Sequence, residues 1–234
     1  MQGAFSYVTT SSNIIQSVTY ETNNGVLDLS SIDIRDPYGV HTNANTQLTQ
    51  VAPGKSVFTD GTFNYLAAAS SGGDGIVVLR HSIGIADNGS GVYMGISSYP
   101  QSSGKASYSG SYNGILTSDV HTGKGELSGT INLEVGFSRD TISGQLDRSV
   151  PVIAGIDHSK LAGPIAFTGD INDGVSIRAI IDDPTQPGVP NAQVSGLTHD
   201  SGAVGDFVMY RDNATTGPRG RTSEVGVYSA DMVP

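Results

Sequence analysis

Residues 104–114, GKASYSGSYNG, alternate two kinds of side chain along the chain. The even positions carry small or aromatic residues, namely Ala106, Tyr108, Gly110, Tyr112 and Gly114. The odd positions carry polar residues, namely Ser107, Ser109, Ser111 and Asn113. A period of two predicts a β-strand, although glycine is a poor strand former. A face on which tyrosine alternates with glycine therefore needs a reason beyond strand propensity.

The same alternation recurs through the second half of the chain. Residues 126–137, ELSGTINLEVGF, alternate without a break, and residues 141–148 follow after a short turn, which predicts a hairpin. Further alternating segments lie at residues 161–171, 175–181, 192–198, 203–210 and 223–230. Together with the opening stretch they make about eight strands, a spacing typical of an all-β barrel or sandwich.

Glycine recurs on the apolar face of most of these predicted strands, at positions 110, 129, 144, 163, 169, 196 and 205. A sheet closed into a small barrel explains the pattern, because its lumen cannot hold a large side chain at every inward position. Glycine also permits the coiling that closure needs. The sequence therefore predicts an eight-stranded antiparallel β-barrel over residues 100–234, with tyrosines filling the space beside the glycines. An ordinary β-sandwich is the alternative.

The first 99 residues have a different character. They contain several alternating segments separated by long polar loops, which predicts a β-rich handle domain over residues 1–99. Residues 64–70, NYLAAAS, favour one short helix, because leucine and alanine are good helix formers. Residues 97–104, SSYPQSSG, are typical of a joint between two domains. Long irregular loops commonly carry binding residues.

Charge and composition exclude several classes of function. The chain has 12 Lys and Arg against 22 Asp and Glu, a net charge of −10, which disfavours nucleic acid and anionic membrane surfaces as partners. No apolar run approaches the ~20 residues that cross a bilayer, so no transmembrane segment is expected. The chain has no cysteine, which excludes disulfides, thiolate metal sites and a cysteine nucleophile.

No motif predicts catalysis. PGKS at residues 53–56 lacks the first glycine of a phosphate loop, because Thr49 stands there. HDSG at residues 199–202 contains a tripeptide of aspartic proteases, but a hairpin turn explains it better. NDG at residues 172–174 is likewise typical of a hairpin turn rather than of a calcium loop. We therefore expect neither an enzyme nor a metal site.

The histidines are the candidate ligand-binding residues. None of the five pairs with another at metal-ligand spacing. His41 lies in a long polar loop beside Tyr38, His81 ends an apolar run, and His121 lies between the first two predicted barrel strands. A neutral imidazole in an apolar cleft is a common axial ligand of haem. These four residues are haem candidates, and ordinary surface or loop positions are the alternative.

Three segments carry a resemblance to a known family. PQSSGKASYSGSYNG at residues 100–114 resembles the start of the β-barrel domain of transferrin-binding-protein-B-like proteins. NAQVSGLTHDSGAVGDFVMY at residues 191–210 resembles the late hairpin of that domain, and EVGVYSA at residues 224–230 resembles its closing strand. The resemblance covers about residues 98–231, and the first hundred residues show no handle motif of the family.

The resemblance implies a handle-plus-barrel protein exported by Gram-negative bacteria, either secreted or held on the exterior of the outer membrane. It implies capture of haem, of another nutrient, or of a host iron or haem protein for uptake, with either haem or no cofactor bound. An outer-membrane receptor or an export barrel would be a further partner. The chain has no N-terminal lipidated cysteine, which fits a released or processed form. A surface adhesin or structural surface protein without a small-molecule site is the alternative.

Overall fold

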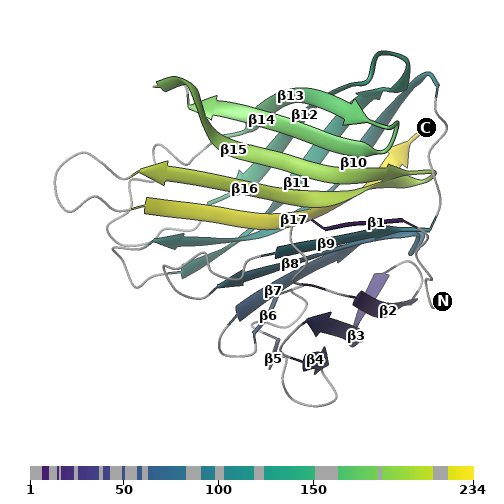
Figure 1. The fold of residues 1–234 in the computed structure, drawn as a ribbon, viewed down its shortest axis with the longest axis vertical. Coiled ribbons are helices and arrows are strands. Elements are labelled where there is room, and N and C mark those ends of the chain that lie inside the picture. The colour runs from purple at the N-terminus through teal and green to yellow at the C-terminus, as the bar shows by residue number, and fades with distance from the viewer. Residues whose placement is uncertain are drawn as a thin grey trace.

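The computed structural model describes most of the chain as β-strand. The described residues are 7–10, 15, 17–23, 26–36, 39–42, 49–50, 57–59, 63–82, 91–97, 103–118, 124–150, 163–183, 186–212 and 221–234. Their strands form a closed eight-stranded barrel, a six-stranded sheet and a three-stranded sheet. The two smaller sheets lie together on one side of the barrel as its handle (Figure 1). The predicted all-β class, with a barrel and a β-rich handle, is confirmed.

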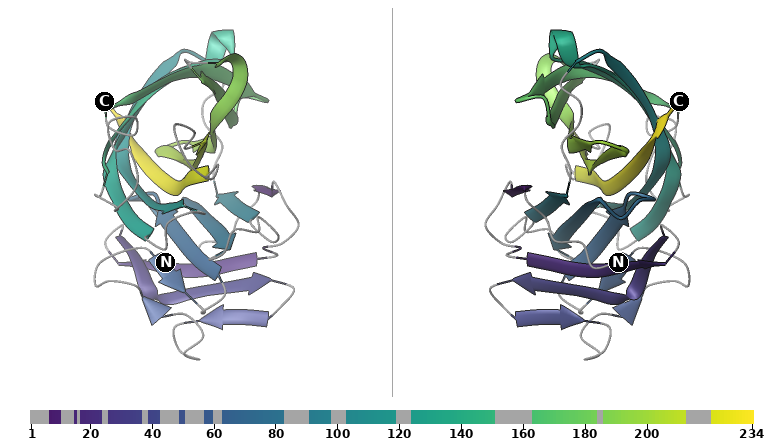
Figure 2. Two further views of the ribbon diagram at one scale, coloured as in Figure 1. Left: turned by 90° about the vertical axis from the view of Figure 1, so that its left-hand side faces the viewer. Right: turned by 90° about the vertical axis from the view of Figure 1, so that its right-hand side faces the viewer.

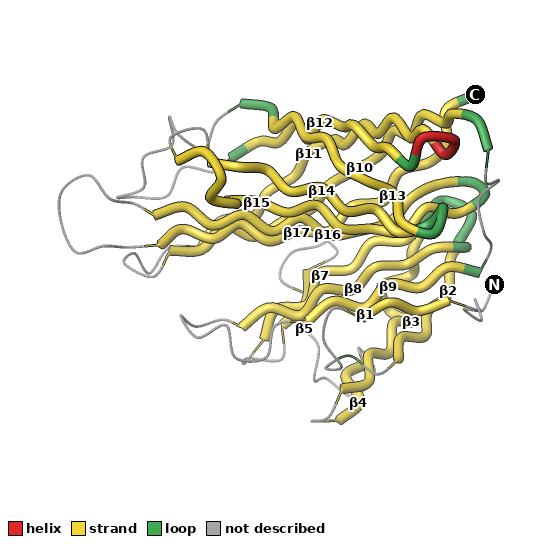
Figure 3. Tube along the Cα trace, turned by 45° about the horizontal axis from the view of Figure 1, so that its top comes forward, coloured by secondary structure: helices red, strands yellow, loops and turns green. Residues whose placement is uncertain are grey.

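The barrel is built from eight antiparallel strands in chain order. Its strands are β10 (Lys105–Ser118), β11 (Lys124–Gly136), β12 (Thr141–Ser149), β13 (Ile165–Asn172), β14 (Ser176–Asp183), β15 (Gln186–His199), β16 (Gly202–Asp212) and β17 (Arg221–Val233). The first strand also pairs with the last, which closes the sheet into the ring seen end-on in Figure 2. A short 3-10 helix, η1 (Phe137–Arg139), connects β11 to β12 at the end of the barrel where the C-terminus lies (Figure 3).

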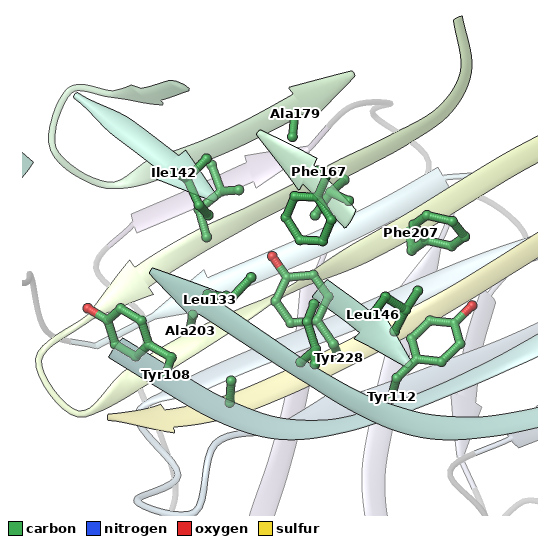
Figure 4. Packing of buried hydrophobic residues seen from close by; sticks show 14 of the residues in the cluster. Tyr108, Tyr112, Leu133, Ile142, Leu146, Phe167, Ala179, Ala203, Phe207 and Tyr228 are labelled. Carbon is green, nitrogen blue, oxygen red and sulfur yellow. The ribbon is translucent and has the colours of Figure 1, made fainter. Parts of the chain in front are cut away.

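The lumen of the barrel is filled by buried hydrophobic side chains, many of them large (Figure 4). Some of these side chains pack against glycines. Tyr108 and Tyr112 of β10 are each 1% exposed and project into this core. A Cβ atom added at Gly114 or Gly226 would lie inside 3.0 Å of Tyr112 atoms. The alternation of tyrosine and glycine therefore serves packing around Tyr112, whose ring covers backbone that carries no side chain at Gly114 and Gly226.

Two other glycines, Gly205 and Gly163, show where the prediction of inward-facing glycines holds and where it does not. A Cβ at Gly205 would lie inside 3.0 Å of both the Tyr228 ring and the Ser195 backbone. Gly163, which the sequence placed on the same apolar face, lies before β13 instead, with a positive φ of 99° and no atom within 4 Å of a built Cβ. It serves the connection into β13, where the chain needs the left-handed region that glycine tolerates.

The handle has two stacked sheets. The six-stranded sheet has the order β1 (Tyr7–Thr10), β9 (Gly91–Ile96), β8 (Gly75–Ser82), β7 (Phe63–Ala69), β6 (Val57–Thr59) and β5 (Thr49–Gln50). The three-stranded sheet has the order β2 (Ser17–Asn23), β3 (Val26–Asp36) and β4 (Gly39–Thr42). Apolar residues of both sheets, including Tyr20, Ile32, Tyr65 and Val78, form one core between them.

The short helix predicted for residues 64–70 is wrong, because this segment forms strand β7. Its two faces are both buried: Tyr65 and Ala67 pack toward the three-stranded sheet, and Leu66 and Ala68 pack toward the barrel. A strand covered on both faces reads as a continuous apolar run without alternation. Small alanines suit a strand between two layers, so tertiary packing overrides their helix propensity.

The handle and the barrel share an aliphatic interface. Leu66, Val77 and Met94 of the handle belong to one buried cluster with Val204 and Val227 of the barrel. The six-stranded sheet therefore lies between the three-stranded sheet and the barrel wall, and the molecule has three layers at this level (Figure 2).

Candidate functional site

The four residues predicted from sequence do not form one described site. Tyr38 and His121 lie outside the described residues. His41 lies in β4, where it pairs with Ile34 of β3. His81 lies in β8 of the other handle sheet, where it pairs with Asn64 and is 6% exposed. A haem site that uses these residues stays a prediction.

His81 lies in a buried polar corner of the handle. By strand alternation its side chain lies on the same side of β8 as Val77 and Leu79, which face the barrel. The neighbouring Asn64 is 1% exposed, and its side-chain amide has no hydrogen-bond partner within the described part of the chain. Buried side-chain amides ordinarily have hydrogen-bond partners, so the amide of Asn64 could still accept or donate a hydrogen bond here.

A buried ion pair crosses the inside of the barrel. Arg148 of β12 donates from Nε to both carboxylate oxygens of Glu224 of β17, at 2.7 and 2.9 Å, and both side chains are 0% exposed. Tyr112 of β10 donates to the same carboxylate at 3.0 Å, and Arg148 also donates to the carbonyl of Gly163 at 3.0 Å. Burial, and then the charge of Glu224, hold the pKa of Tyr112 well above its usual value. The group braces three strands and leaves no reactive atom open to a ligand.

A second polar cluster joins the handle to the barrel. Asp74, in the β7–β8 turn, accepts hydrogen bonds from Ser70 and from Ser201, each at 2.6 Å, and His199 Nδ1 lies 3.3 Å from its Oδ2 atom. Burial acts to raise the pKa of Asp74, but the hydrogen bonds from His199, Ser201 and Ser70 outweigh it, so this pKa lies well below its usual range.

The cluster contains serine, histidine and aspartate but lacks the geometry of a nucleophilic triad. Ser201 donates to the carboxylate of Asp74 rather than to an imidazole, and its Oγ is 3.5 Å from His199 Nδ1. A triad needs the serine on one ring nitrogen and the acid on the other. HDSG at residues 199–202 is the β15–β16 turn, as expected from the sequence.

The same turn of the handle is held from two further directions. The hydroxyl of Tyr20 in β2 donates to the carbonyl of Gly73 at 2.7 Å. The backbone N–H of Ser71 donates to the carboxylate of Asp231 in β17 at 3.2 Å. These bonds connect all three layers at one end of the interface.

A lone carboxylate lies within the aliphatic interface. Asp206 of β16 is 7% exposed and lies between Val204 and Val208 on the outer face of the barrel that meets the handle. Burial raises its pKa to about 7, and hydrogen bonds from its own backbone and from Ser195 oppose that rise only in part. Its Oδ1 has no hydrogen-bond partner among the described residues.

The outer wall of the barrel is hollowed on the side away from the handle. A cavity of about 590 Å³ is lined by Asn132, Glu134, Ser143, Gly144, Gln145, Ala166, Phe167, Thr168, Ile180 and Ile181. A second cavity, of about 460 Å³, adjoins it near η1 and shares Glu134, Ser143 and Thr168 with it. Strands β13 and β14, which carry part of the first cavity, lie at the top of Figure 1. This wall is the candidate binding surface.

Sequence reasoning missed the buried charges, although the sequence carries a signal for them. Arg148 follows Ile142, Gly144 and Leu146 on the inward face of its strand, and Glu224 shares the parity of Tyr228. A charged residue at an apolar position of an alternating strand is uncommon, and it marks a buried pair.

No group of acidic residues and histidines suited to a metal ion occurs in the described part of the chain. The described residues also include no helix with the length and hydropathy to cross a bilayer.

Comparison with known proteins gives structural matches alone. No protein-family profile and no curated protein sequence matches the chain. Two structures of the vaccine antigen transferrin binding protein B from Haemophilus parasuis, a double mutant and a single mutant, are similar at 13% and 15% identity, with TM-scores of 0.46 and 0.48. The protein of that name from serogroup B Neisseria meningitidis is similar at 15% identity, with a TM-score of 0.45. The matches cover 94%, 97% and 94% of this chain but 45%, 45% and 44% of those chains, so it spans less than half of their length.

Proposed function

We propose that this chain is an exported, non-enzymatic binding protein that captures a nutrient-carrying host protein, such as an iron or haem protein, outside a Gram-negative cell. The observation that carries the proposal is the filled lumen of the barrel. Tyr108, Tyr112 and Tyr228 pack within it and are each at most 1% exposed, so a ligand would contact the outer surface. An outer surface suits a macromolecular partner better than a small molecule, which needs an enclosing pocket.

Further features support a binding role. A hydrogen bond from Ser201 and the contact of His199 with the carboxylate of Asp74 join the handle to the barrel, and such a joint would present both parts of the surface to a partner in one fixed arrangement. The serine and the histidine at this joint both contact the carboxylate of the aspartate, an arrangement without the geometry of a nucleophilic triad. This supports a non-enzymatic role. The resemblance of residues 98–231 to the barrel of transferrin-binding-protein-B-like proteins adds host transferrin to the partners worth testing.

Binding to host proteins tests the proposal directly. The chain would be immobilised and exposed to iron-loaded transferrin, to haemoglobin and to serum albumin as the control, and association would be followed by biolayer interferometry. We expect saturable binding to transferrin or haemoglobin and none to albumin. Absence of binding to both iron-carrying proteins would refute capture of these partners.

Haem itself is the small-ligand form of the same proposal, with His41 and His81 as the candidate axial ligands. Its test is a titration with haemin, in which coordination gives a sharp shift of the Soret band. The shift should be lost in His81→Ala or His41→Ala, and an exposed-residue variant such as Ser109→Ala should keep it. A spectrum that stays that of free haemin would rule out this form and leave capture of a protein untouched.

A further inference from the structure

The barrel wall is incompletely paired between β13 and β14. Hydrogen-bonded register joins Gly169–Asn172 of β13 to Ser176–Ala179 of β14, which is four residue pairs. The adjoining strand pairs β12–β13 and β14–β15 are joined over six and eight residue pairs, and β10–β11 is joined over thirteen. The part of β13 before Gly169 and the part of β14 after Ala179 therefore run without each other as register partners. We call the space between them the wall slot, and the cavity of about 590 Å³ lies over it, lined from both strands.

The orientation of the backbone groups at the wall slot follows from one hydrogen bond. The N–H of Ile171 donates to the carbonyl of Asp140, at 2.9 Å, on the β12 side of β13. Backbone groups of alternate residues in a strand point to the same side. Phe167 therefore directs its N–H and C=O toward β12, and Ala166 and Thr168 direct theirs into the slot.

The other edge of the slot follows from register. Asp170 lies opposite Arg178, and both direct their backbone groups toward each other. Two residues further along β14, the N–H and C=O of Ile180 therefore also point into the slot. The backbone groups of the register pair Gly169 and Ala179 point away from each other, so the ladder beside them joins the N–H of Ile180 to the C=O of Thr168. Beyond that bond, within the described residues, the ladder gives no partner across the slot to Ala166, to the N–H of Thr168 or to the C=O of Ile180.

An irregularity on the far side of β14 explains why the strands part. The register between β14 and β15 shifts between Ile181 and Asp182 and again between Asp182 and Asp183. Bulges of this kind bend a strand and increase its twist. The bend begins one residue after Ile180, where the pairing with β13 has already ended, so the free edge is built into the barrel.

The side chains around the slot restrict what can lie there. Ile180 is 45% exposed and is one of three large exposed hydrophobic residues in the described chain. Serine, threonine, asparagine and glutamine supply the uncharged polar part of the lining, and glycine, alanine, phenylalanine and a second isoleucine supply the rest of its apolar part. Glu134 is the one charged residue among the lining residues, so the cavity carries a negative charge on a chain that is already acidic.

We propose that the wall slot binds an extended segment of a partner protein by β-strand addition, with a basic side chain of that segment near Glu134 and an aliphatic side chain against Ile180. Free strand edges pair with extended chains because both present the same spacing of donors and acceptors. This inference is independent of whether the partner carries iron or haem, and it assigns the interaction to the wall opposite the handle.

Amide hydrogen exchange of the whole chain tests whether the edge is free. We expect the N–H groups of Ala166 and Thr168 to exchange at least about 100-fold faster than those of Phe167 and Gly169, because only the latter two point at β12. The four amides belong to one strand, which makes the second pair an internal control. Equal protection of both pairs would mean that the edge is already occupied by this chain or by a second copy, and it would overturn the proposal.

Peptide binding tests the occupant. The probe is a fluorescent ten-residue peptide of alternating threonine and valine that ends in two lysines, and anisotropy reports its binding. N-methylation of two alternate backbone nitrogens should weaken binding about tenfold or more, since each lost main-chain hydrogen bond costs about fivefold. Replacement of the lysines by glutamates should weaken it about threefold or more.

Matched variants connect that binding to the wall slot. Ile180→Ser and Glu134→Gln should each weaken binding about threefold or more. Val233→Ser, at another exposed apolar residue, and Glu126→Gln, on the same strand as Glu134, should not. Absence of peptide binding, or binding that is indifferent to N-methylation or to Ile180→Ser, would overturn the proposal, whatever the outcome with transferrin and haemoglobin.

Discussion

The two largest cores of this molecule are built from different residues. The barrel lumen contains six aromatic side chains, among them Tyr112, Phe167 and Tyr228. The interface between handle and barrel contains none and is made of valine, leucine, isoleucine, methionine and alanine. The difference follows from shape: inside the strongly curved wall, rings such as those of Tyr112, Phe167 and Tyr228 cover backbone at glycine positions. Where the six-stranded sheet lies against the outer face of the barrel wall, aliphatic residues of the two layers interdigitate.

The two cores also treat charge differently. The lumen holds Arg148 and Glu224 as a hydrogen-bonded pair, with Tyr112 on the same carboxylate. The interface holds Asp206 without a charged partner among the groups that shift its pKa. Burial of a paired charge is tolerated as long as its partner is present, whereas burial of a lone carboxylate is tolerated as long as the group is protonated. The two cores should therefore respond to different perturbations.

Removal of the arginine should have the largest effect. Arg148→Met leaves the carboxylate of Glu224 buried without its counter-charge, and we expect the free energy of unfolding to fall by about 3–5 kcal/mol. The double variant Arg148→Met with Glu224→Leu should recover most of that loss, because no buried charge remains. Urea denaturation of the wild type, both single variants and the double variant measures the coupling. An additive double variant would show that the pair is not a unit.

The distance between these partners shows how far the sequence predicts the structure. The alternation of residues 126–137 and 141–148 predicts the β11–β12 hairpin, because neighbouring strands are coded locally. Arg148 and Glu224 lie 76 positions apart, and only closure of the barrel brings them together. The strand β7 is mispredicted for a similar reason, since the two layers that bury its alanines come from distant parts of the chain. The free edge of β13 depends on a bulge in β14, and no pattern of residues in the sequence predicts that bulge.

The lone interface carboxylate should give the next largest effect, and it should appear as a pH dependence. Because burial raises the pKa of Asp206 to about 7, the folded chain keeps a proton that the unfolded chain releases near pH 4. The unfolded state then binds fewer protons between these values, so stability falls as pH rises from about 4 to about 7. A difference of about three pKa units corresponds to about 4 kcal/mol.

The variant Asp206→Asn removes the titrating group. Its free energy of unfolding should lack this decline, so the variant should gain on the wild type between pH 5 and pH 8, measured by urea denaturation at each pH. Asp147→Asn, at an exposed aspartate of the barrel wall, is the control and should leave the decline in place. A decline that persists in Asp206→Asn would contradict the assignment.

A methyl group inside the barrel should have the third largest effect. The Cβ of Gly205→Ala would meet the Tyr228 ring and the Ser195 backbone, neither of which can withdraw freely. We expect a loss of about 1–3 kcal/mol from overpacking. At the interface, Val77→Ile adds the same single carbon between aliphatic layers and should cost less. Thermal unfolding of both variants compares the two cores directly, and an equal loss in both would remove the distinction drawn from curvature.

The aspartate at the end of the interface should give the smallest effect, and its pH dependence should have the opposite sign to that of Asp206. Hydrogen bonds from His199, Ser201 and Ser70 hold the pKa of Asp74 below its usual range. The stability it contributes is therefore present above about pH 4, the unfolded value, and is lost as pH falls through the lower folded value. Because the side chain is 22% exposed, we expect Asp74→Asn to cost only about 1 kcal/mol at pH 7.

Urea denaturation at pH 7 and at pH 3 separates the two aspartates. Asp74→Asn should be less stable than the wild type at pH 7, and the difference should shrink at pH 3, where the wild type begins to lose the same interactions. Ser201→Ala should reproduce part of the loss at pH 7, because it removes one of the hydrogen bonds to the carboxylate. A difference that grows on acidification would mean that the carboxylate of Asp74 destabilises the joint. In that case the Asp74 cluster would not help to hold the handle to the barrel.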